Sequence, residues 1–126
     1  MTSQKFFRCK HCGNFVGLVT GGGVPMICCG EPMEELIPNT SDGAGEKHVP
    51  AVYVDGNTVT VQVGTVMHPA LPEHHIEFIY LETENGGQRK SIVVGADPVA
   101  HFLLTGDKPV AVYEYCNLHG LWKAEI

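Results

Sequence analysis

The chain has 126 residues, about the size of one domain, and its 44% hydrophobic and 17% charged residues are typical of a globular protein. It has no apolar run of membrane-spanning length and no apolar signal segment at its start, so we expect a cytoplasmic protein without a membrane partner. The net charge of -6 and the absence of a basic run argue against nucleic acid as a partner, and an anionic substrate would need a local cation.

The first segment, residues 1–37, contains four of the five cysteines. Cys9 and Cys12 form a Cys-x-x-Cys pair, and Cys28 and Cys29 are adjacent. A segment of this size is too small to be held together by a hydrophobic core, and a metal cross-link would supply what the core cannot. In a chain without an export signal, an odd number of cysteines favours metal binding or catalysis over disulfides.

Four thiolates in one small segment predict a tetrahedral site for zinc or iron, and the spacing does not separate the two metals. A structural zinc ribbon therefore remains an alternative here. Side chains of neighbouring residues in an extended chain point to opposite faces, so Cys28 and Cys29 reach one metal only if the backbone twists. This predicts a distorted tetrahedron. His11 lies inside the Cys-x-x-Cys pair and is expected to face solvent, because four sulfurs already complete the shell.

Residues 38–47 are polar and contain glycine, which is typical of a linker or loop. The rest of the chain is rich in β-branched residues, with turn signals at 55–57 and 85–87. Segment 99–104 is ambiguous between a strand and a helical turn. The other predicted strands cover 51–54, 58–63, 75–83, 88–94, 110–115 and 121–124. About seven short strands at this spacing predict an antiparallel β-sandwich over residues 38–126.

Five residues of this second segment are candidates for a second metal site: His48, His68, His74, Cys116 and His119. Imidazole suits iron, copper, zinc and nickel, and a thiolate shifts the preference towards softer metals or redox use. Any one of these histidines is more often a surface or core residue than a ligand. Cys116 and His119 are the strongest local pair, because both lie within one turn at the end of a predicted strand.

Several motifs together resemble the desulfoferrodoxin family. They are Glu-Lys-His-Val-Pro at 46–50, His68-Pro69 with His74, Cys-Asn-Leu-His-Gly at 116–120, Trp-Lys-Ala-Glu at 122–125, and the four-cysteine set. The resemblance covers almost the whole chain, and the motifs occur in the expected order.

The resemblance implies an all-β protein with a small desulforedoxin-like domain (1–37) followed by an immunoglobulin-like antiparallel β-sandwich (38–126). It implies two irons per chain. The first is bound by Cys9, Cys12, Cys28 and Cys29. The second, catalytic iron has four histidines in a plane and one cysteine on the axis; these are His48, His68, His74, His119 and Cys116. The sixth position is open in the ferrous state.

The implied activity is that of a superoxide reductase, which reduces superoxide by one electron to hydrogen peroxide in oxidative-stress defence. The implied electron donor is a small carrier such as rubredoxin, and family members are commonly homodimers. The resemblance also assigns catalytic roles to Glu46, as a ligand of the oxidised iron, and to Lys47, near the open site. Physical reasoning agrees: an axial thiolate pushes electron density towards the group opposite it, and Lys47 would supply a local cation. Without the resemblance, Lys47 reads as an ordinary solvated lysine.

The sequence departs from the family pattern around the third histidine, where His75 takes the place of an aromatic residue. The spacing from His68 favours His74 as the ligand, and period-two alternation puts His74 and His75 on opposite faces. His101 matches no ligand position and is expected to be structural or exposed. Three other functions compete with the reductase: a pure electron-transfer protein, a zinc-ribbon binding module, and a superoxide dismutase. An open coordination site beside Glu46 and Lys47 argues against a pure electron relay.

Overall fold

The computed structural model describes residues 3–41, 43 and 45–126, without the side chain of Glu46. The chain divides into two compact units, Met1–Ile37 and Pro38–Ile126. No helix within the described ranges is both long enough and apolar enough to span a membrane. The all-β class predicted from the sequence is confirmed, with one short helix, α1 (Gly45–His48), as the exception.

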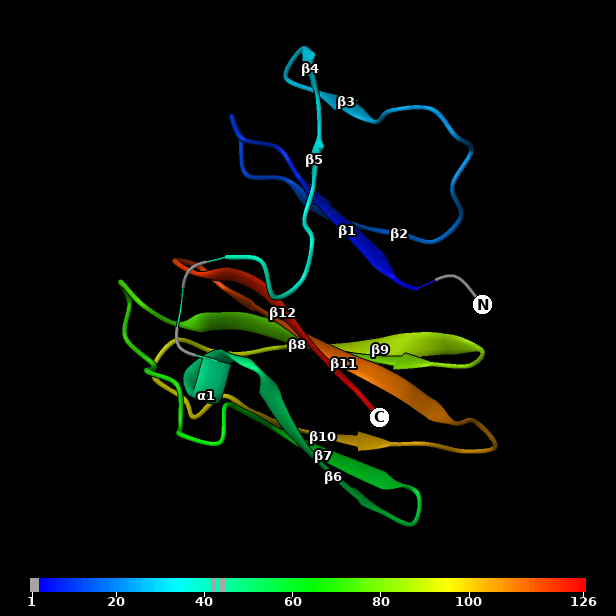
Figure 1. Cartoon of the computed structure of the whole chain (residues 1–126), viewed down its shortest axis with the longest axis vertical. Helices are drawn as coiled ribbons and strands as arrows, with labels where there is room; N and C mark the ends of the chain where they lie inside the picture. The colour runs from blue at the N-terminus through cyan, green and yellow to red at the C-terminus, as the bar shows by residue number, and fades with distance from the viewer. Residues whose placement is uncertain (1–2, 42, 44) are drawn as a thin grey trace. The chain divides into compact units, whose positions relative to one another are not determined.

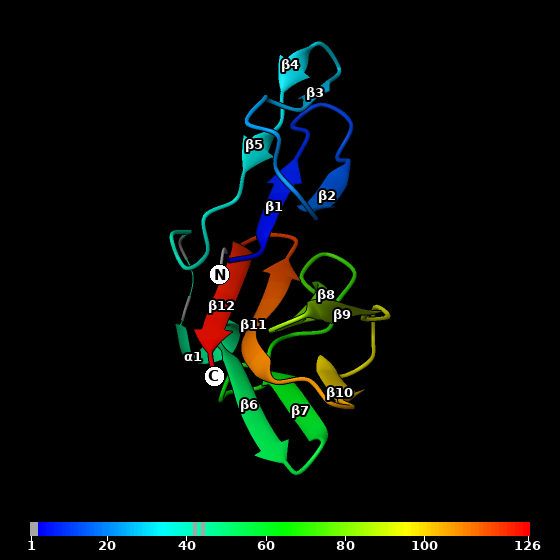
Figure 2. The ribbon, with the colours of Figure 1, turned by 90° about the vertical axis from the view of Figure 1, so that its right-hand side faces the viewer.

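The first unit is built from short strands. These are β1 (Lys5–Arg8), β2 (Phe15–Leu18), β3 (Ile27–Cys28), β4 (Glu31–Pro32) and β5 (Glu34–Glu35). One sheet has the order β2-β1-β5, and β3 pairs with β4 at the other end of the unit (Figure 2). Among the residues described in this unit, only Phe6 and Cys9 are buried. The unit therefore has almost no hydrophobic core, as its size predicts.

The second unit is a two-layer β-sandwich (Figure 1). Its strands are β6 (Pro50–Asp55), β7 (Thr58–Val63), β8 (Ile76–Thr83), β9 (Gly86–Ser91), β10 (Val99–Leu103), β11 (Pro109–Cys116) and β12 (Gly120–Glu125). One sheet has the order β10-β7-β6 and the other the order β12-β11-β8-β9. Neighbouring strands are antiparallel throughout. This division of seven strands into two sheets is that of an immunoglobulin-like sandwich.

The core lies between the two sheets and follows the period of two along each strand. In β7, Val59, Val61 and Val63 are completely buried, whereas the residues between them are less so. From the facing sheet, Ile79 and Leu81 of β8 join the same cluster. The cluster also contains Cys116, so the hydrophobic core continues to the end of β11, where the histidines gather.

The structure resolves or corrects three predictions for the second unit. Segment 99–104 is a strand, because Val99–Leu103 pairs with β7. The turn between β8 and β9 lies one residue earlier than 85–87: Gly86 and Gly87 already pair with Thr83 and Glu82 of β8. The predicted loop 38–47 runs into the helical turn α1, which is closed by a hydrogen bond from Val49 N to Gly45 O.

A substitution at Gly87 would test how closely β8 and β9 approach each other. A Cβ at this position would collide with the Tyr80 phenol and would lie 2.8 Å from the carbonyl oxygen of Leu81. We expect Gly87→Ala to lower the free energy of unfolding by roughly 1–3 kcal/mol, the usual cost of overpacking. Gly86→Ala is the matched control, since a Cβ there meets nothing within 4 Å. Equal denaturation midpoints for the two variants would contradict this account.

Candidate metal centres

The five candidate ligands of the second unit come from strand ends. His48 ends α1 just before β6, and His68 follows the turn after β7. His74 lies two residues before β8, Cys116 ends β11, and His119 lies in the turn before β12. Because these strands are antiparallel, the starts of β6, β8 and β12 and the ends of β7 and β11 meet at one end of the sandwich. The topology thus gathers residues that are far apart in the sequence.

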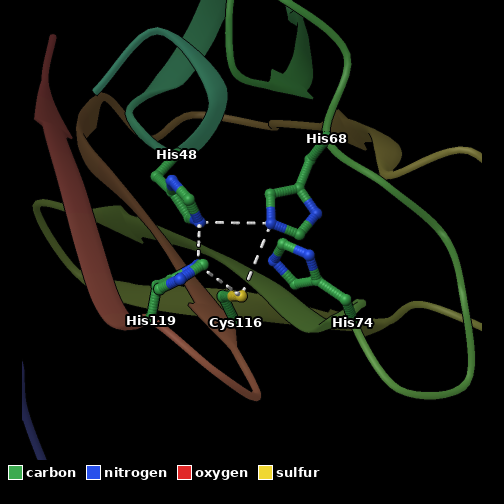
Figure 3. Close-up of side chains that lie close together, drawn as sticks. All are labelled: His48, His68, His74, Cys116 and His119. Carbon is green, nitrogen blue, oxygen red and sulfur yellow. Dashed lines mark hydrogen bonds between the residues drawn. The ribbon is translucent and has the colours of Figure 1, made fainter. Parts of the chain in front are cut away.

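The imidazole rings of the four histidines are arranged in a circle (Figure 3). Successive rings, in the order 48, 68, 74, 119, have centroids 4.7, 4.6 and 5.0 Å apart, and the circuit closes at 4.7 Å between 119 and 48. Neighbouring rings are close to perpendicular, at 75° to 88°. The diagonal between His48 and His74 is longer, at 6.3 Å. The rings therefore stand around a common point.

The thiol of Cys116 lies against this ring. Its Sγ is 3.4 Å from His68 Nε2 and 3.9 Å from His119 Nδ1. His48 Nε2 lies 3.2 Å from His68 Nε2 and 3.0 Å from His119 Nδ1. All five ligand atoms lie within 4.8 Å of one another. The site thus offers four imidazole nitrogens and one sulfur to a single ion.

Hydrogen bonding fixes which nitrogen of His68 is available. Its Nδ1 lies 2.8 Å from the carbonyl oxygen of Pro69, which can only accept, so Nδ1 carries the proton and Nε2 presents its lone pair to the cluster. The Nε2 atom of His74 is buried and has no hydrogen-bond partner. An unsatisfied buried nitrogen is costly, and a metal ion at the centre of the ring would satisfy it.

Burial disfavours the charged forms of three of the ligands, His68, His74 and Cys116. Burial lowers the pKa of His68 to about 4 and also lowers the pKa of His74. Burial raises the pKa of the Cys116 thiol. Neutral imidazoles are ready to bind a metal, whereas the thiol must lose its proton on binding.

The number and type of donors fit iron better than structural zinc. Structural zinc sites are almost always closed by four ligands in a tetrahedron, whereas this cluster offers five. Four imidazoles and one thiolate would hold an iron that can still accept a further ligand, as a catalytic metal must. His48 and His68 are buried, whereas His74 and His119 are partly exposed, so solvent reaches the cluster past the latter two.

Trp122 supports two of the ligands, a role that sequence reasoning missed. Its indole stacks on His48, with centroids 5.0 Å apart and planes at 26°, and its Nε1–H donates to the carbonyl oxygen of His119 at 3.0 Å. The motif 122–125 contributed to the family resemblance, but nothing in its spacing shows that the tryptophan contacts a residue 74 positions earlier in the chain.

The segment before His48 is fastened to strand β12, which follows His119. The side chain of Asn39 accepts a hydrogen bond from Lys123 N at 2.8 Å and donates to Lys123 O at 3.1 Å. Gly43 packs directly on the site, since a Cβ there would lie 3.2 Å from His48 and 3.3 Å from His119. Because glycine has no side chain, this segment can lie close to both ligands.

The remaining predicted residues are placed as follows. Lys47 is exposed on α1, and its charge is one of the causes that lower the pKa of His74, after burial and His119. Glu46 belongs to α1, but its side chain lies outside the described residues. His75 lies outside the cluster, with Nδ1 3.1 Å from Leu71 O and 3.0 Å from Pro72 O. His101 is exposed and hydrogen-bonded to Thr60.

The cysteines of the first unit form a second cluster, Cys9, Cys12, Cys28 and Cys29, with all four sulfurs within 4.8 Å of one another. Cys29 has a φ of 52°, in the left-handed region that few residues other than glycine adopt. This confirms the expected backbone twist at the adjacent pair. His11 is exposed and pairs with Glu31 at 3.1 Å, as expected for a residue outside the metal shell.

Electrostatics in the four-cysteine cluster favour a bound cation. The backbone N–H of Cys12 donates to Cys9 Sγ at 3.5 Å and is the largest cause that lowers the pKa of Cys9 to about 6. Hydrogen bonds with Cys12 and Cys9 raise the pKa of Cys28 and raise that of Cys29 to about 12. Cys9 therefore ionises readily, whereas Cys28 and Cys29 keep their protons. A bound metal ion would stabilise their thiolates as well.

Comparison with known families covers nearly the whole sequence. Residues 40–125 match the family model described as Desulfoferrodoxin, and residues 2–36 match that of the Desulfoferrodoxin N-terminal domain. A desulfoferrodoxin from Nitratidesulfovibrio vulgaris is 46% identical over 121 residues, which cover 96% of this chain and 95% of the relative.

Solved structures give the same result. The crystal structure of the superoxide reductase from Treponema pallidum has a TM-score of 0.83 and 37% identity, covering 98% of this chain and all of that one. A one-iron superoxide reductase (1Fe-SOR) from Giardia intestinalis has a TM-score of 0.56 and 38% identity, covering 64% of this chain and 97% of that one. The similarity therefore extends beyond the sandwich to the full two-unit chain in the first case.

The low pKa of His68 predicts acid sensitivity of the metal-free protein. Its pKa rises from about 4 in the fold to the ordinary 6.5 in the unfolded chain, so the unfolded state binds more protons between these values. The contribution of neutral His68 to the free energy of unfolding is complete above pH 6.5. As the pH falls from 6.5 towards 4, the free energy of unfolding decreases by about 3 kcal/mol. Lowered basicity of His74 acts in the same direction.

Denaturant unfolding of the metal-free protein across this pH range measures the effect. His68→Gln should flatten the pH dependence, because glutamine does not titrate, whereas the exposed His101→Gln should leave it unchanged. A profile with the same slope in wild type and His68→Gln would show that His68 is not the group responsible.

Proposed function

This chain belongs to the desulfoferrodoxin family, and on that basis we propose that it is a superoxide reductase with two domains, 1–37 and 38–126. Its cofactors are two iron ions, one held by four cysteines and one by four histidines and a cysteine. The observation that carries the proposal is the five-donor cluster at one end of the sandwich, in a chain that matches a superoxide reductase structure along 98% of its length.

The reaction adds one electron and two protons to superoxide and yields hydrogen peroxide. When bound in the five-donor cluster, iron supplies the electron by changing from the ferrous to the ferric state. The chain's own residues orient and tune this site: His48, His68, His74 and His119 surround the metal position, and Cys116 contributes a thiolate from one side. The anionic sulfur of Cys116 would make a bound iron a better electron donor.

Lys47 attracts the anionic substrate. The protein has a net charge of -6, so superoxide needs a local positive charge to approach the site. Lys47 is exposed and sits next to His48 on α1, and its charge is felt at His74. Glu46, its neighbour on α1, is proposed as the residue whose carboxylate would bind the iron in its oxidised form.

The enzyme needs an external electron for each turnover, and a small carrier such as rubredoxin is proposed as the donor. We further propose a homodimer located in the cytoplasm. A reducing compartment is supported by the cysteines, because all five are free thiols and both clusters need thiolates to bind metal.

Product analysis tests the function. Iron-loaded, pre-reduced protein receives superoxide, and both peroxide and oxygen are measured. A reductase forms as much peroxide as the superoxide it consumes and needs an electron donor to continue. Oxygen release without a donor would indicate dismutation instead, and iron-loaded protein that leaves superoxide untouched would refute the proposal.

The Cys116→Ser variant tests whether the sulfur is needed for this activity. Serine removes the sulfur with little change in volume, so the visible band of the histidine site and most of the reduction should disappear. The spectrum of the four-cysteine site serves as the internal reference, because its ligands belong to the other unit. Full activity in this variant would remove Cys116 from the mechanism.

Replacing Lys47 tests electrostatic attraction. We expect Lys47→Ile to slow the reaction with superoxide by about tenfold and to weaken its dependence on ionic strength, because both effects come from the same charge. Stopped-flow or pulse-radiolysis kinetics at several salt concentrations measure both.

Lys108→Ile is the control for net charge. Lys108 is also exposed but lies before β11, whereas Cys116 ends that strand, roughly 25 Å away along an eight-residue strand. The Lys108→Ile substitution changes the net charge by the same amount as Lys47→Ile, but at the far end of the sandwich. If the two variants slow the reaction equally, the effect belongs to overall charge and Lys47 has no local role.

A further inference from the structure

His74 is carried by a loop that needs outside support. The loop runs from β7 to β8, and its tip is closed by two backbone hydrogen bonds between Leu71 and His74, at 2.9 and 3.1 Å. Both bonds are internal to the loop. They give the tip its shape, but they do not fix its position relative to the other four ligands.

That position is fixed by Asn117. Its Oδ1 accepts a hydrogen bond from His75 N at 2.9 Å, and its Nδ2 donates to Glu73 O at 3.1 Å. Its backbone N–H also donates to His75 O at 3.2 Å. One residue therefore holds the peptide groups on both sides of His74. Asn117 follows Cys116 directly, so it joins the loop to the strand end that provides the sulfur.

The other three histidines have supports of a different kind. The ring of His68 is oriented by the carbonyl of Pro69, and the ring of His48 stacks on Trp122. The same tryptophan holds the carbonyl of His119. For His74, in contrast, Asn117 acts on the peptide groups on either side of the residue, and the buried Nε2 stays without a hydrogen-bond partner and is available to a metal.

From these contacts we infer that Asn117 is a positioning residue that aims His74 at the catalytic metal. Its amide is suited to the role because it offers an acceptor and a donor on one short planar group. An aspartate keeps the acceptor for His75 N but loses the donor and places a negative charge against the carbonyl oxygen of Glu73. An alanine loses both contacts while the backbone hydrogen bond can remain.

The first experiment measures ferrous iron affinity at the histidine site by competition with a chelator under anaerobic conditions. Loss of an outer support to a metal ligand typically weakens binding 10- to 100-fold, and we expect this for Asn117→Asp and Asn117→Ala. The visible band of the oxidised site should shift, while the four-cysteine spectrum stays constant. Asn85→Ala is the matched control, because Asn85 is also a loop asparagine with a side-chain hydrogen bond, at 3.1 Å to Asp107.

A double-mutant cycle separates positioning of His74 from a general structural effect. If Asn117 acts through His74, adding Asn117→Ala to His74→Ala causes no further loss of iron affinity. Additive losses, or wild-type affinity in both Asn117 variants, would overturn the inference.

This inference rests on the proposed iron site but not on the substrate, because affinity is measured without superoxide. Wild-type protein that binds no iron at the histidine site would overturn both proposals. Wild-type protein that binds iron, with Asn117 variants that bind it equally well, would overturn the inference about Asn117 alone.

Discussion

The convergence of five lone-pair donors on one point is the constraint on which the sandwich unit depends. Nitrogens of His48 and His68 lie 3.2 Å apart, and the sulfur of Cys116 lies 3.4 Å from the latter. Buried lone pairs this close to one another cannot all accept hydrogen bonds from the protein or from water. A single cation can bind all of them. Hydrogen bonds and ring stacking with neighbouring residues hold the donors in this arrangement.

The antiparallel topology is what makes such convergence possible. Residues at strand starts and strand ends meet on one side of the sandwich, and short loops then adjust each ring. A β-bulge helps at the most buried ligand: Cys116 pairs with Ile76 and the preceding residue, Tyr115, pairs with Phe78, so β8 has one extra residue beside the sulfur. Bulges often occur next to active sites, where they redirect a side chain. Rigid strands thus supply the sulfur, whereas loops and a helical turn supply the nitrogens.

Much of this could be predicted from the sequence, for physical reasons that differ from residue to residue. The strand 58–63 is readable because alternate valines face the core. The twist at Cys29 follows from two adjacent ligands for one metal. In contrast, Asn117 bonds to peptide groups of Glu73 and His75, and Trp122 stacks on the ring of His48, all far earlier in the chain. No local side-chain pattern reveals such contacts. The turn after β8 was misplaced because Gly86 and Gly87 look like turn residues, although Gly87 is needed within β9 to make room for Tyr80.

The two clusters also differ in how much chain each metal must bring together. The contact between Cys9 and Cys28 spans 19 residues, whereas the contact between His48 and His119 spans 71. Closing a short loop is fast and needs little other structure, but pairing distant segments waits for the sheets to assemble. During synthesis on the ribosome, the first unit can therefore take up its metal while the chain is still growing. The histidine site needs donors from His48 to His119 and the strands that carry them, so it can take up its metal only after the sandwich has been synthesised and has folded.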